Sequence, residues 1–341
     1  MRLDPPPYIA AATVWLPPGR ESARDAVTAG RLDGAAAEQD GYATLAISTE
    51  WSGPQMAASA AAKALAEAGC DPATVGLVVH AWTHHQGHDF WSPAHYVAHA
   101  VGADRAQPVG VQMMSNGGAI AVEIAATRLA ADPAVGRALV TTGDRFADEG
   151  FDRWGDYGVA YGDGGTALLL DRHQGPYRLL AAHTVSAPEL EVMHRGDDPF
   201  TPAPRWSADR IDARRTKKAF LAAGGGPRFE AVSGQSIARA LLGALADAGK
   251  APDDPRLRFL VLPRLGRGLF EDHLPGLAGL GLSGAEPLTT MGGHTGHLGG
   301  GDPIANLADL HTQGRFGPGD LALLLSVGGG FGWTALLVEA G

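Results

Sequence analysis

The chain repeats a short helix-ending pattern, and this repeat constrains the fold more than any other feature. Residues 64–69 read ALAEAG and residues 244–249 read ALADAG. Each copy closes a helical pattern at a glycine, which is a common helix stop. An apolar run typical of a buried strand follows each copy, over residues 75–80 in one case and 257–262 in the other.

A second pair of segments recurs further along the chain. GGTALL at 164–169 resembles GWTALL at 332–337. Because the pieces recur in the same order, we expect two similar halves, 1–172 and 173–341. Short apolar strands alternate with amphipathic helices in each half, which predicts an α/β fold with helices on both faces of the sheets.

The hydrophobic periodicity also places individual elements. Residues 181–228 are less periodic, and we interpret them as an insertion that lines the mouth of a pocket. We expect helices over residues 55–68, 115–131, 236–248 and 302–313. We expect strands over residues 138–142 and 167–170.

Composition excludes several classes of protein. A net charge of -10 argues against non-specific binding to nucleic acid. No apolar run is long enough to cross a bilayer, and the proline-interrupted N-terminus lacks a signal-peptide pattern, so we expect no membrane partner. The one cysteine, Cys70, excludes an intrachain disulfide and fits a reducing compartment, so we expect a cytoplasmic protein.

Basic residues are concentrated in one region in spite of the acidic balance. Two interpretations stay open: a solvated face of a helix, or a dock for an acidic carrier protein or a phosphorylated cofactor. The basic residues are Arg205, Arg210, Arg214, Arg215, Lys217 and Lys218.

The first stretch that carries chemistry is PVGVQMMSNGG, residues 108–118, in which a strand runs into Ser115 and a helix follows at once. A nucleophile at such a turn lies near free backbone N–H groups and the positive end of the helix, which can stabilise an oxyanion. The competing interpretation is that Ser115 only caps the helix, a common role for serine.

The second stretch is GHTGHLGGGDP, residues 293–303, at the position in the second half that matches the Ser115 turn. A pseudo-twofold axis would bring the two turns together. Histidine supplies the base that a serine nucleophile needs, and a carboxylate such as Asp302 orients the imidazole. Otherwise His297 is a loop histidine bonded to backbone, and Asp302 is a helix cap before Pro303.

The third stretch is SVGGGFGW, residues 326–333. Glycines after a buried strand let backbone N–H groups approach a ligand closely, which suits the second half of an oxyanion hole. Taken alone, the stretch is only a tight turn.

A group of histidines offers a rival site. Two of them, four residues apart in a helical segment, would share a face and could chelate zinc. No HExxH pattern and no cysteine accompany them, so solvated loop histidines are favoured and no metal is expected. The histidines are His80, His84, His85, His88, His95 and His99.

The three stretches, in this order on a duplicated α/β chain, resemble the ketoacyl synthase III family of the thiolase superfamily, including its acyltransferase-like members from natural-product pathways. The resemblance implies a thiolase fold, in which two duplicated αβα halves form a layered αβαβα core. The family has cysteine where this chain has Ser115, and Arg264 stands where the family has a histidine. The family's asparagine falls on His294 or His297, of which His297 is preferred because Asp302 follows closely.

By this resemblance, Ser115, His297 and Asp302 form a catalytic set. The backbone N–H groups of Ser115 and Gly329 form the oxyanion hole, and His294 contacts substrate. The resemblance also implies a homodimer in which Phe90 and Trp91 reach toward the partner's pocket. The acyl donor is the phosphopantetheine thioester of coenzyme A or of an acyl carrier protein, and no cofactor is bound permanently. The basic residues 210–218 would dock that donor.

Three functions follow as hypotheses. In the first, Ser115 takes an acyl group from a thioester and passes it to a hydroxyl or amine. In the second, the protein is a decarboxylative synthase that primes a polyketide with a starter unit. That reaction needs two donors on the enolate oxygen, and one of the family's two is missing here. In the third, the chain is a non-catalytic homologue.

Overall fold

The computed structural model describes residues 1–204, 208–271, 276–277 and 279–341. Ten strands form one hydrogen-bonded sheet in the order β10-β9-β11-β12-β8-β1-β7-β6-β4-β5, and β2 pairs with β3 separately. The strands are β1 (Tyr8–Trp15), β2 (Gly19–Ser22), β3 (Thr44–Ile47), β4 (Leu77–Ala81), β5 (Gln107–Val111), β6 (Arg137–Asp144), β7 (Gly164–Asp171), β8 (Tyr177–Ser186), β9 (Leu257–Val261), β10 (Glu286–Leu288), β11 (Leu321–Gly328) and β12 (Gly332–Ala340).

The sheet consists of two five-stranded parts with the same topology. One part has the order β5-β4-β6-β7-β1 and the other β10-β9-β11-β12-β8. In each part the first three strands are parallel and the last two are antiparallel to their neighbours. A short antiparallel pairing of β1 with β8, at Tyr8 and Ile9, joins the parts. The boundary at 172/173, which lies in the loop between β7 and β8, stays a prediction.

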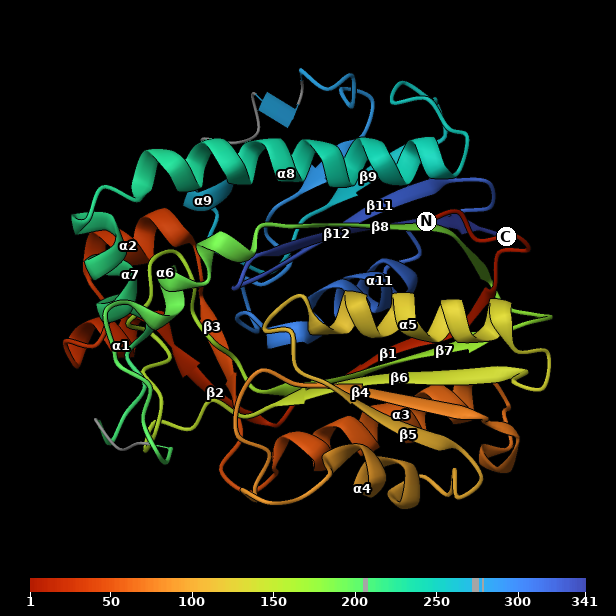
Figure 1. Ribbon diagram of the computed structural model, residues 1–341, viewed down its shortest axis with the longest axis horizontal. Coiled ribbons are helices and arrows are strands. Elements are labelled where there is room, and N and C mark those ends of the chain that lie inside the picture. Colours follow the sequence, from red (N-terminus) through yellow and green to blue (C-terminus); the bar gives the residue numbers. More distant parts are fainter. Residues whose placement is uncertain (205–207, 272–275, 278) are drawn as a thin grey trace.

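Helices complete five layers, as Figure 1 shows. The long α8 covers the β8–β12 side at the top, α5 and α11 lie in the middle, and α3 and α4 cover the first-half strands at the bottom. The helices are α1 (Ala23–Thr28), α2 (Gly34–Asp40), α3 (Gly53–Glu67), α4 (Pro93–Ala100), α5 (Gly117–Ala131), α6 (Val192–Arg195), α7 (Ala213–Ala222), α8 (Gly226–Asp247), α9 (Gly268–Glu271) and α11 (Asp302–Thr312). The predicted α/β class and layered thiolase-type core are confirmed.

The central layer explains why the core needs small and apolar side chains. Both α5 and α11 contact strands of the sheet; α11 is buried over most of its length, whereas α5 also has an exposed face that carries Ile124, Thr127 and Arg128. A helix that is apolar on nearly all sides is stable only between other elements. Val122 of α5 and Ile304 of α11 belong to the same core cluster as Val140 and Leu324 from the two sheet parts.

The predicted insertion over residues 181–228 is wrong at both ends. Strand β8 continues to Ser186 because it pairs with β12 along its length. Helix α8 begins at Gly226, well before the expected Ser236, and a proline occupies its first turn, where a missing N–H costs nothing. The segment in between carries α6 and α7. In the part of the chain that the structure describes, no helix is long and apolar enough to cross a membrane.

Candidate active site

Ser115 lies in the turn between β5 and α5, and its side chain is half-buried. Helix α5 begins at Gly117 with Asn116 in the capping position, so Ser115 is not the helix cap. Its Oγ instead lies 2.7 Å from Nε2 of His297. Met114 just before it has φ 48°, a left-handed conformation that is strained for a residue with a side chain. Strain of this kind gathers at functional sites.

The backbone of His297 is held on both sides by the segment before β7. Its N–H donates to the carbonyl of Ala160 at 2.8 Å, and its own carbonyl accepts from the N–H of Gly162 at 3.0 Å. The imidazole is buried, and Nδ1 lies 2.6 Å from Oδ2 of Asp302. The ring is therefore fixed between a hydroxyl and a carboxylate.

Asp302 is the first residue of α11, with Gly301 in the capping position. Its Oδ2 also accepts from the N–H of Arg264 at 2.7 Å, and its Oδ1 accepts from the N–H of Leu298 at 2.8 Å. Three donors thus hold the carboxylate at a helix N-terminus, where a negative charge is favoured. This network assigns the His297 proton to Nδ1 and leaves the Nε2 lone pair toward Ser115.

The two turns meet because both are made of glycine where they touch. A Cβ built on Gly118 would lie 2.0 Å from the carbonyl oxygen of Gly300, so no larger residue fits without movement. This backbone contact brings the start of α5 against the start of α11. It places a serine from one half beside a histidine that is 182 residues away in sequence.

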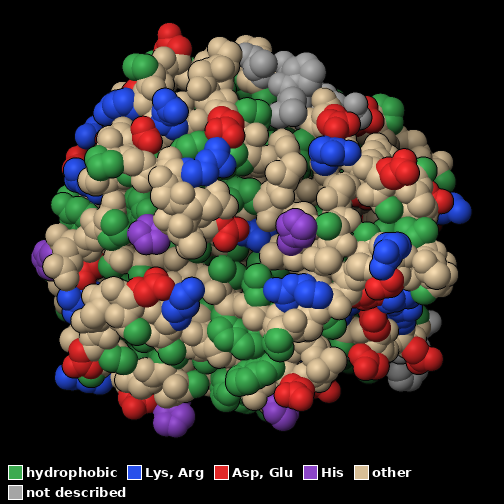
Figure 2. Space-filling view, turned by 180° about the vertical axis from the view of Figure 1, so that it is seen from behind, with side chains coloured by type: hydrophobic (Ala, Val, Ile, Leu, Met, Phe, Trp, Pro, Cys, Tyr) green, Lys and Arg blue, Asp and Glu red, His purple; other side chains and the backbone are tan. Residues whose placement is uncertain are grey.

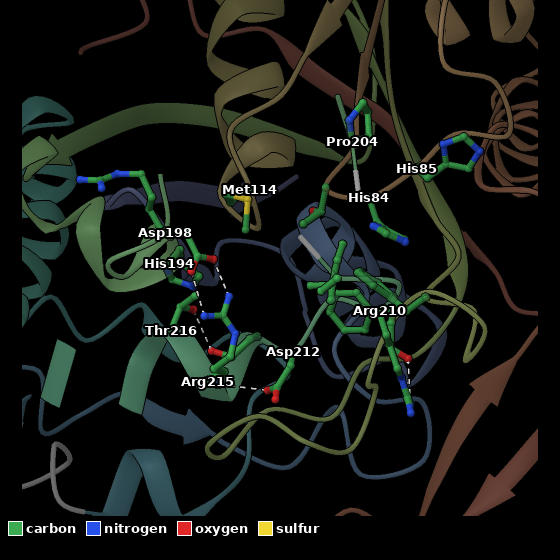
Figure 3. A pocket seen from close by; sticks show the side chains of 18 of the residues that line it. His84, His85, Met114, His194, Asp198, Pro204, Arg210, Asp212, Arg215 and Thr216 are labelled. Carbon is green, nitrogen blue, oxygen red and sulfur yellow. Dashed lines mark hydrogen bonds and ion pairs between the residues drawn. The ribbon is translucent and has the colours of Figure 1, made fainter. Parts of the chain in front are cut away.

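Ser115 opens into a cavity of about 1000 Å³, part of whose lining is drawn in Figure 3. Gly329 and Met114 line it close to the serine. Three aromatic side chains, Phe146, Phe151 and Tyr161, form one wall and contact each other at ring-centroid distances of 4.8 to 5.0 Å. Burial and the adjacent Asp156 carboxylate raise the pKa of Tyr161 well above its usual value, so Tyr161 stays neutral.

Arg264, at the position of the family's missing histidine, does not line the cavity. Its buried guanidinium is committed elsewhere: Nε to Asn306 at 2.8 Å and Nη2 to Asp309 at 2.5 Å. Its contribution to the site is the backbone N–H that holds Asp302. Sequence reasoning noticed this residue only as a substitution and missed that role.

Asp144, at the end of β6, also escaped sequence reasoning. The carboxylate is buried and accepts from the N–H groups of Thr83 at 2.9 Å and His84 at 2.7 Å. Burial raises its pKa to about 7. A Cβ on Gly299, close to His297 in the chain, would lie 2.6 Å from this carboxylate. A strand that ends in Asp is too common a pattern to have predicted a buried carboxyl group with a raised pKa.

Several predicted contacts lie outside the site. His294 is exposed and does not line the cavity, and its backbone carbonyl accepts from the hydroxyl of Thr44 at 3.0 Å. Phe90 is fully exposed, and Trp91 is 41% exposed, with its ring against His88 and Tyr96. These two aromatics have no core role in the single chain.

The basic cluster is largely neutralised within the chain. Lys217 is mostly buried and pairs with Asp156 at 2.7 Å, which removes it from any docking surface. Arg215 pairs with Asp198 through two contacts of 2.9 and 2.5 Å, and Arg210 lies 3.4 Å from Asp152. Of the predicted docking residues, Arg214 and Lys218 are exposed without an ion pair to a described residue, although Arg214 stacks over the Tyr157 ring. Arg205 lies outside the described residues.

The predicted rival histidines do not converge. His80 is buried against Thr141 and Gln86, whereas His95 and His99 bond Ser92 and Asp104 on the surface. No group of three or more potential metal ligands is found among the residues that the structure describes.

The amino-acid sequence is similar to that of ketoacyl synthase III proteins in two comparisons. Residues 276–340 match the model of the 3-oxoacyl-[acyl-carrier-protein] synthase III C-terminal family. A β-ketoacyl-[acyl-carrier-protein] synthase III of Rhizorhabdus wittichii is 26% identical over 288 residues, which cover 83% of each chain.

Solved structures of similar fold align with nearly the whole chain. ChlB3, described as an acyltransferase, aligns with a TM-score of 0.90 and 29% identity over 98% of both chains. The 3-oxoacyl-[acyl-carrier-protein] synthase III of Aquifex aeolicus aligns with a TM-score of 0.77 over 98% of this chain and 99% of its own, at 20% identity, which supports the fold alone.

The layered core is of the thiolase type, as in the solved structures that it resembles. The protein is ketoacyl synthase III-like in sequence and structure, and it is an enzyme of the acyl-transferring type.

Proposed function

We propose that the protein transfers an acyl group from a coenzyme A or carrier-protein thioester, through an ester on Ser115, to a hydroxyl or amine acceptor. The observation that carries this proposal is the unbroken chain of contacts from Ser115 Oγ to His297 and on to Asp302, at 2.7 and 2.6 Å. Serine needs an adjacent base, and a carboxylate orients that base. The similarity to an acyltransferase over 98% of the chain supports the same reaction type.

In the first half-reaction, Oγ of Ser115 attacks the thioester carbonyl while its proton moves to Nε2 of His297. The tetrahedral intermediate collapses, the C–S bond breaks, and the thiol leaves with that proton. In the second half-reaction, the acceptor gives its proton to the same nitrogen and attacks the ester carbonyl. Ser115 then leaves and recovers the proton. We assign oxyanion stabilisation to the backbone N–H groups of Ser115 and Gly329, since both residues line the cavity.

The donor, the partner and the setting are parts of the same proposal. The related synthase of Rhizorhabdus wittichii is named for acyl carrier protein, so we propose a carrier-protein or coenzyme A thioester as donor and no permanently bound cofactor. We further propose a cytoplasmic homodimer that acts in natural-product biosynthesis.

The direct experiment is intact-protein mass spectrometry after incubation with a panel of acyl thioesters. We expect a mass increase of one acyl group in the parent protein and none in Ser115→Ala. Ser59→Ala is a matched control, because Ser59 is half-buried on α3 and bonds only its own helix. An acyl adduct that persists in Ser115→Ala would refute the assigned nucleophile.

Decarboxylative condensation is the second candidate, because the related protein of Rhizorhabdus wittichii is named as a synthase. It ranks lower because the guanidinium of Arg264 is turned into the protein and paired with Asp309, so it supplies no second donor to an enolate. Incubation with malonyl thioesters distinguishes the two candidates: condensation releases carbon dioxide, and simple transfer does not.

A further inference from the structure

His194 is a cavity residue that the proposed mechanism does not use. It lies on α6, the short helix that packs against α7, and its ring lines the same cavity as Ser115. In Figure 3 it appears on the side of the cavity that carries Asp198 and Thr216, away from His84. No motif in the sequence marks this histidine.

The ring lies against the turn that we assign to the oxyanion hole. A Cβ built on Gly329 would lie 2.6 Å from Cε1 and 2.7 Å from Nδ1 of His194. The imidazole therefore occupies the space that a side chain at 329 would fill. The ring therefore borders both the cavity that Ser115 lines and the turn at which the proposed acyl-enzyme would hold its carbonyl.

Neither ring nitrogen of His194 has a hydrogen-bond partner among the described residues. Nδ1 is buried without a partner, which leaves Nε2 as the nitrogen open to the cavity. A buried polar atom without a partner costs stability, and such atoms in native structures call for an explanation. Phe331 lies 5.2 Å from the ring, so a leucine or phenylalanine at 194 would pack there without this cost.

The surroundings keep the imidazole neutral. Burial and the nearby ammonium of Lys217 lower the pKa of His194 to about 4, although Asp156 opposes the shift. Lys217 is held in place by its two contacts to Asp156, at 2.8 and 2.7 Å. At neutral pH the ring thus carries one donor and one acceptor nitrogen, and a hydroxyl can bond to Nε2 in either tautomer.

We propose that His194 recognises the acyl group by a hydrogen bond to a hydroxyl close to its carbonyl, on the second or third carbon. The substrate class is then a short hydroxyacyl thioester. This inference rests on the proposed Ser115 acyl-enzyme and adds the identity of the group that it carries. A site built to bond a substrate hydroxyl discriminates against the analogue that lacks it.

The test compares matched thioesters of a short pantetheine mimic: 2-hydroxypropanoyl with propanoyl, and 3-hydroxybutanoyl with butanoyl. The readout is the rate of Ser115 acylation by intact-protein mass spectrometry. We expect the parent protein to prefer the hydroxylated member of at least one pair by about tenfold, the worth of one good hydrogen bond. His194→Phe should remove the preference, so that the ratio of the two acylation rates in each pair falls to about one. His194→Gln, which can still bond a hydroxyl, should keep part of it.

Equal rates for both members of both pairs in the parent protein overturn the proposal while leaving the acyl-enzyme intact. So does a loss in His194→Phe that is the same for both members. If His194→Phe does not fold, the parent preference and its change in His194→Gln still decide the question. Absence of acylation from every thioester is a different result, because it counts against the acyl-enzyme itself.

Discussion

At the scale of the residue, a serine hydroxyl is almost fully protonated at neutral pH, so the attack by Ser115 depends on its base. We expect His297→Ala to slow acylation by several orders of magnitude, as in serine enzymes generally. Asp302→Asn should leave the fold intact and reduce the rate, because the amide cannot support the same imidazole tautomer. Stopped-flow mixing with a chromogenic thioester measures each rate. Acylation of His297→Ala at the parent rate would disprove this assignment of the base.

The variant Ser115→Cys tests whether His297 acts by removing the proton from the nucleophile at position 115. A thiol ionises far more readily than a hydroxyl, so this variant should acylate and depend less on His297. The double variant Ser115→Cys with His297→Ala should therefore retain more acylation than His297→Ala alone. Equal dependence on His297 in the serine and cysteine forms would show that the imidazole does not act by removing the proton.

Asp144 predicts a pH dependence of stability. Its pKa is about 7 in the folded protein against an ordinary value of 3.8, so the folded state binds the proton more tightly. Preferential binding of this proton stabilises the folded state. The stabilisation is fully present below about pH 4 and is lost as the pH rises through about 7. We expect the free energy of unfolding of Asp144→Asn to rise relative to that of the parent over this window, by up to about 4 kcal/mol. Urea unfolding at several pH values measures it.

Asn at position 144 keeps an oxygen that can accept from the N–H groups of Thr83 and His84. The exposed Asp253, changed to Asn, serves as the control for the substitution itself. If the two variants show the same pH profile, the carboxyl of Asp144 is not protonated in the folded protein near neutrality.

At the scale of the element, the contact between the starts of α5 and α11 depends on Gly118. We expect Gly118→Ala to lower the unfolding midpoint and to slow acylation about a hundredfold or more, because the added Cβ pushes the Gly300 carbonyl away and separates Ser115 from His297. Gly136→Ala is the matched control, since nothing lies within 4 Å of a Cβ there. Thermal unfolding and the chromogenic assay measure both effects.

Helix α7 carries the remaining candidates for docking a carrier protein, Arg214 and Lys218. Changing both to Glu should slow transfer from an acidic carrier protein about tenfold and weaken its dependence on salt. Transfer from a short thioester mimic should not change. The same charge change at the exposed Arg105 and Arg239 is the control. Arg215 is a poor choice, because its change would break the ion pair with Asp198 at the cavity. Equal losses with both donors would indicate damage to the cavity.

At the scale of the whole molecule, the net charge is -10, but charges of both signs occur on the surface. Figure 2 shows acidic and basic side chains interspersed over the face behind that of Figure 1. A carrier protein would therefore be steered by a local group of charges such as that on α7, since no broad basic field covers this face.

The free sheet edge predicts the assembly. Strand β5 ends the sheet, and exposed edge strands are normally covered or paired. Phe90 and Trp91 are exposed on the chain as well. We expect a homodimer at micromolar concentration by light scattering, with the sheets continuing across a twofold axis. Phe90→Ser should weaken it, whereas Phe200→Ser, at an equally exposed aromatic, should not. A folded parent protein that stays monomeric would count against this interface.

The α/β architecture and the positions of the two turns could be read from the amino-acid sequence alone. Repeated helix ends and alternating strand patterns depend on residues close in the chain, so the α/β layers and the turns at Ser115 and His297 could be predicted. Some element bounds were misplaced: β8 extends to Ser186 because it pairs with β12, and α8 begins at Gly226, before the expected Ser236.

The contacts of each polar side chain, by contrast, became known from the folded structure. It placed His297 rather than His294 beside Ser115, buried Lys217 against Asp156 and left His194 without a partner in the cavity. The physical reason is that these environments are made by segments far apart in the chain. Burial, the distance to a charge and the supply of hydrogen-bond partners, which set the protonation and availability of a side chain, exist only once those segments pack together.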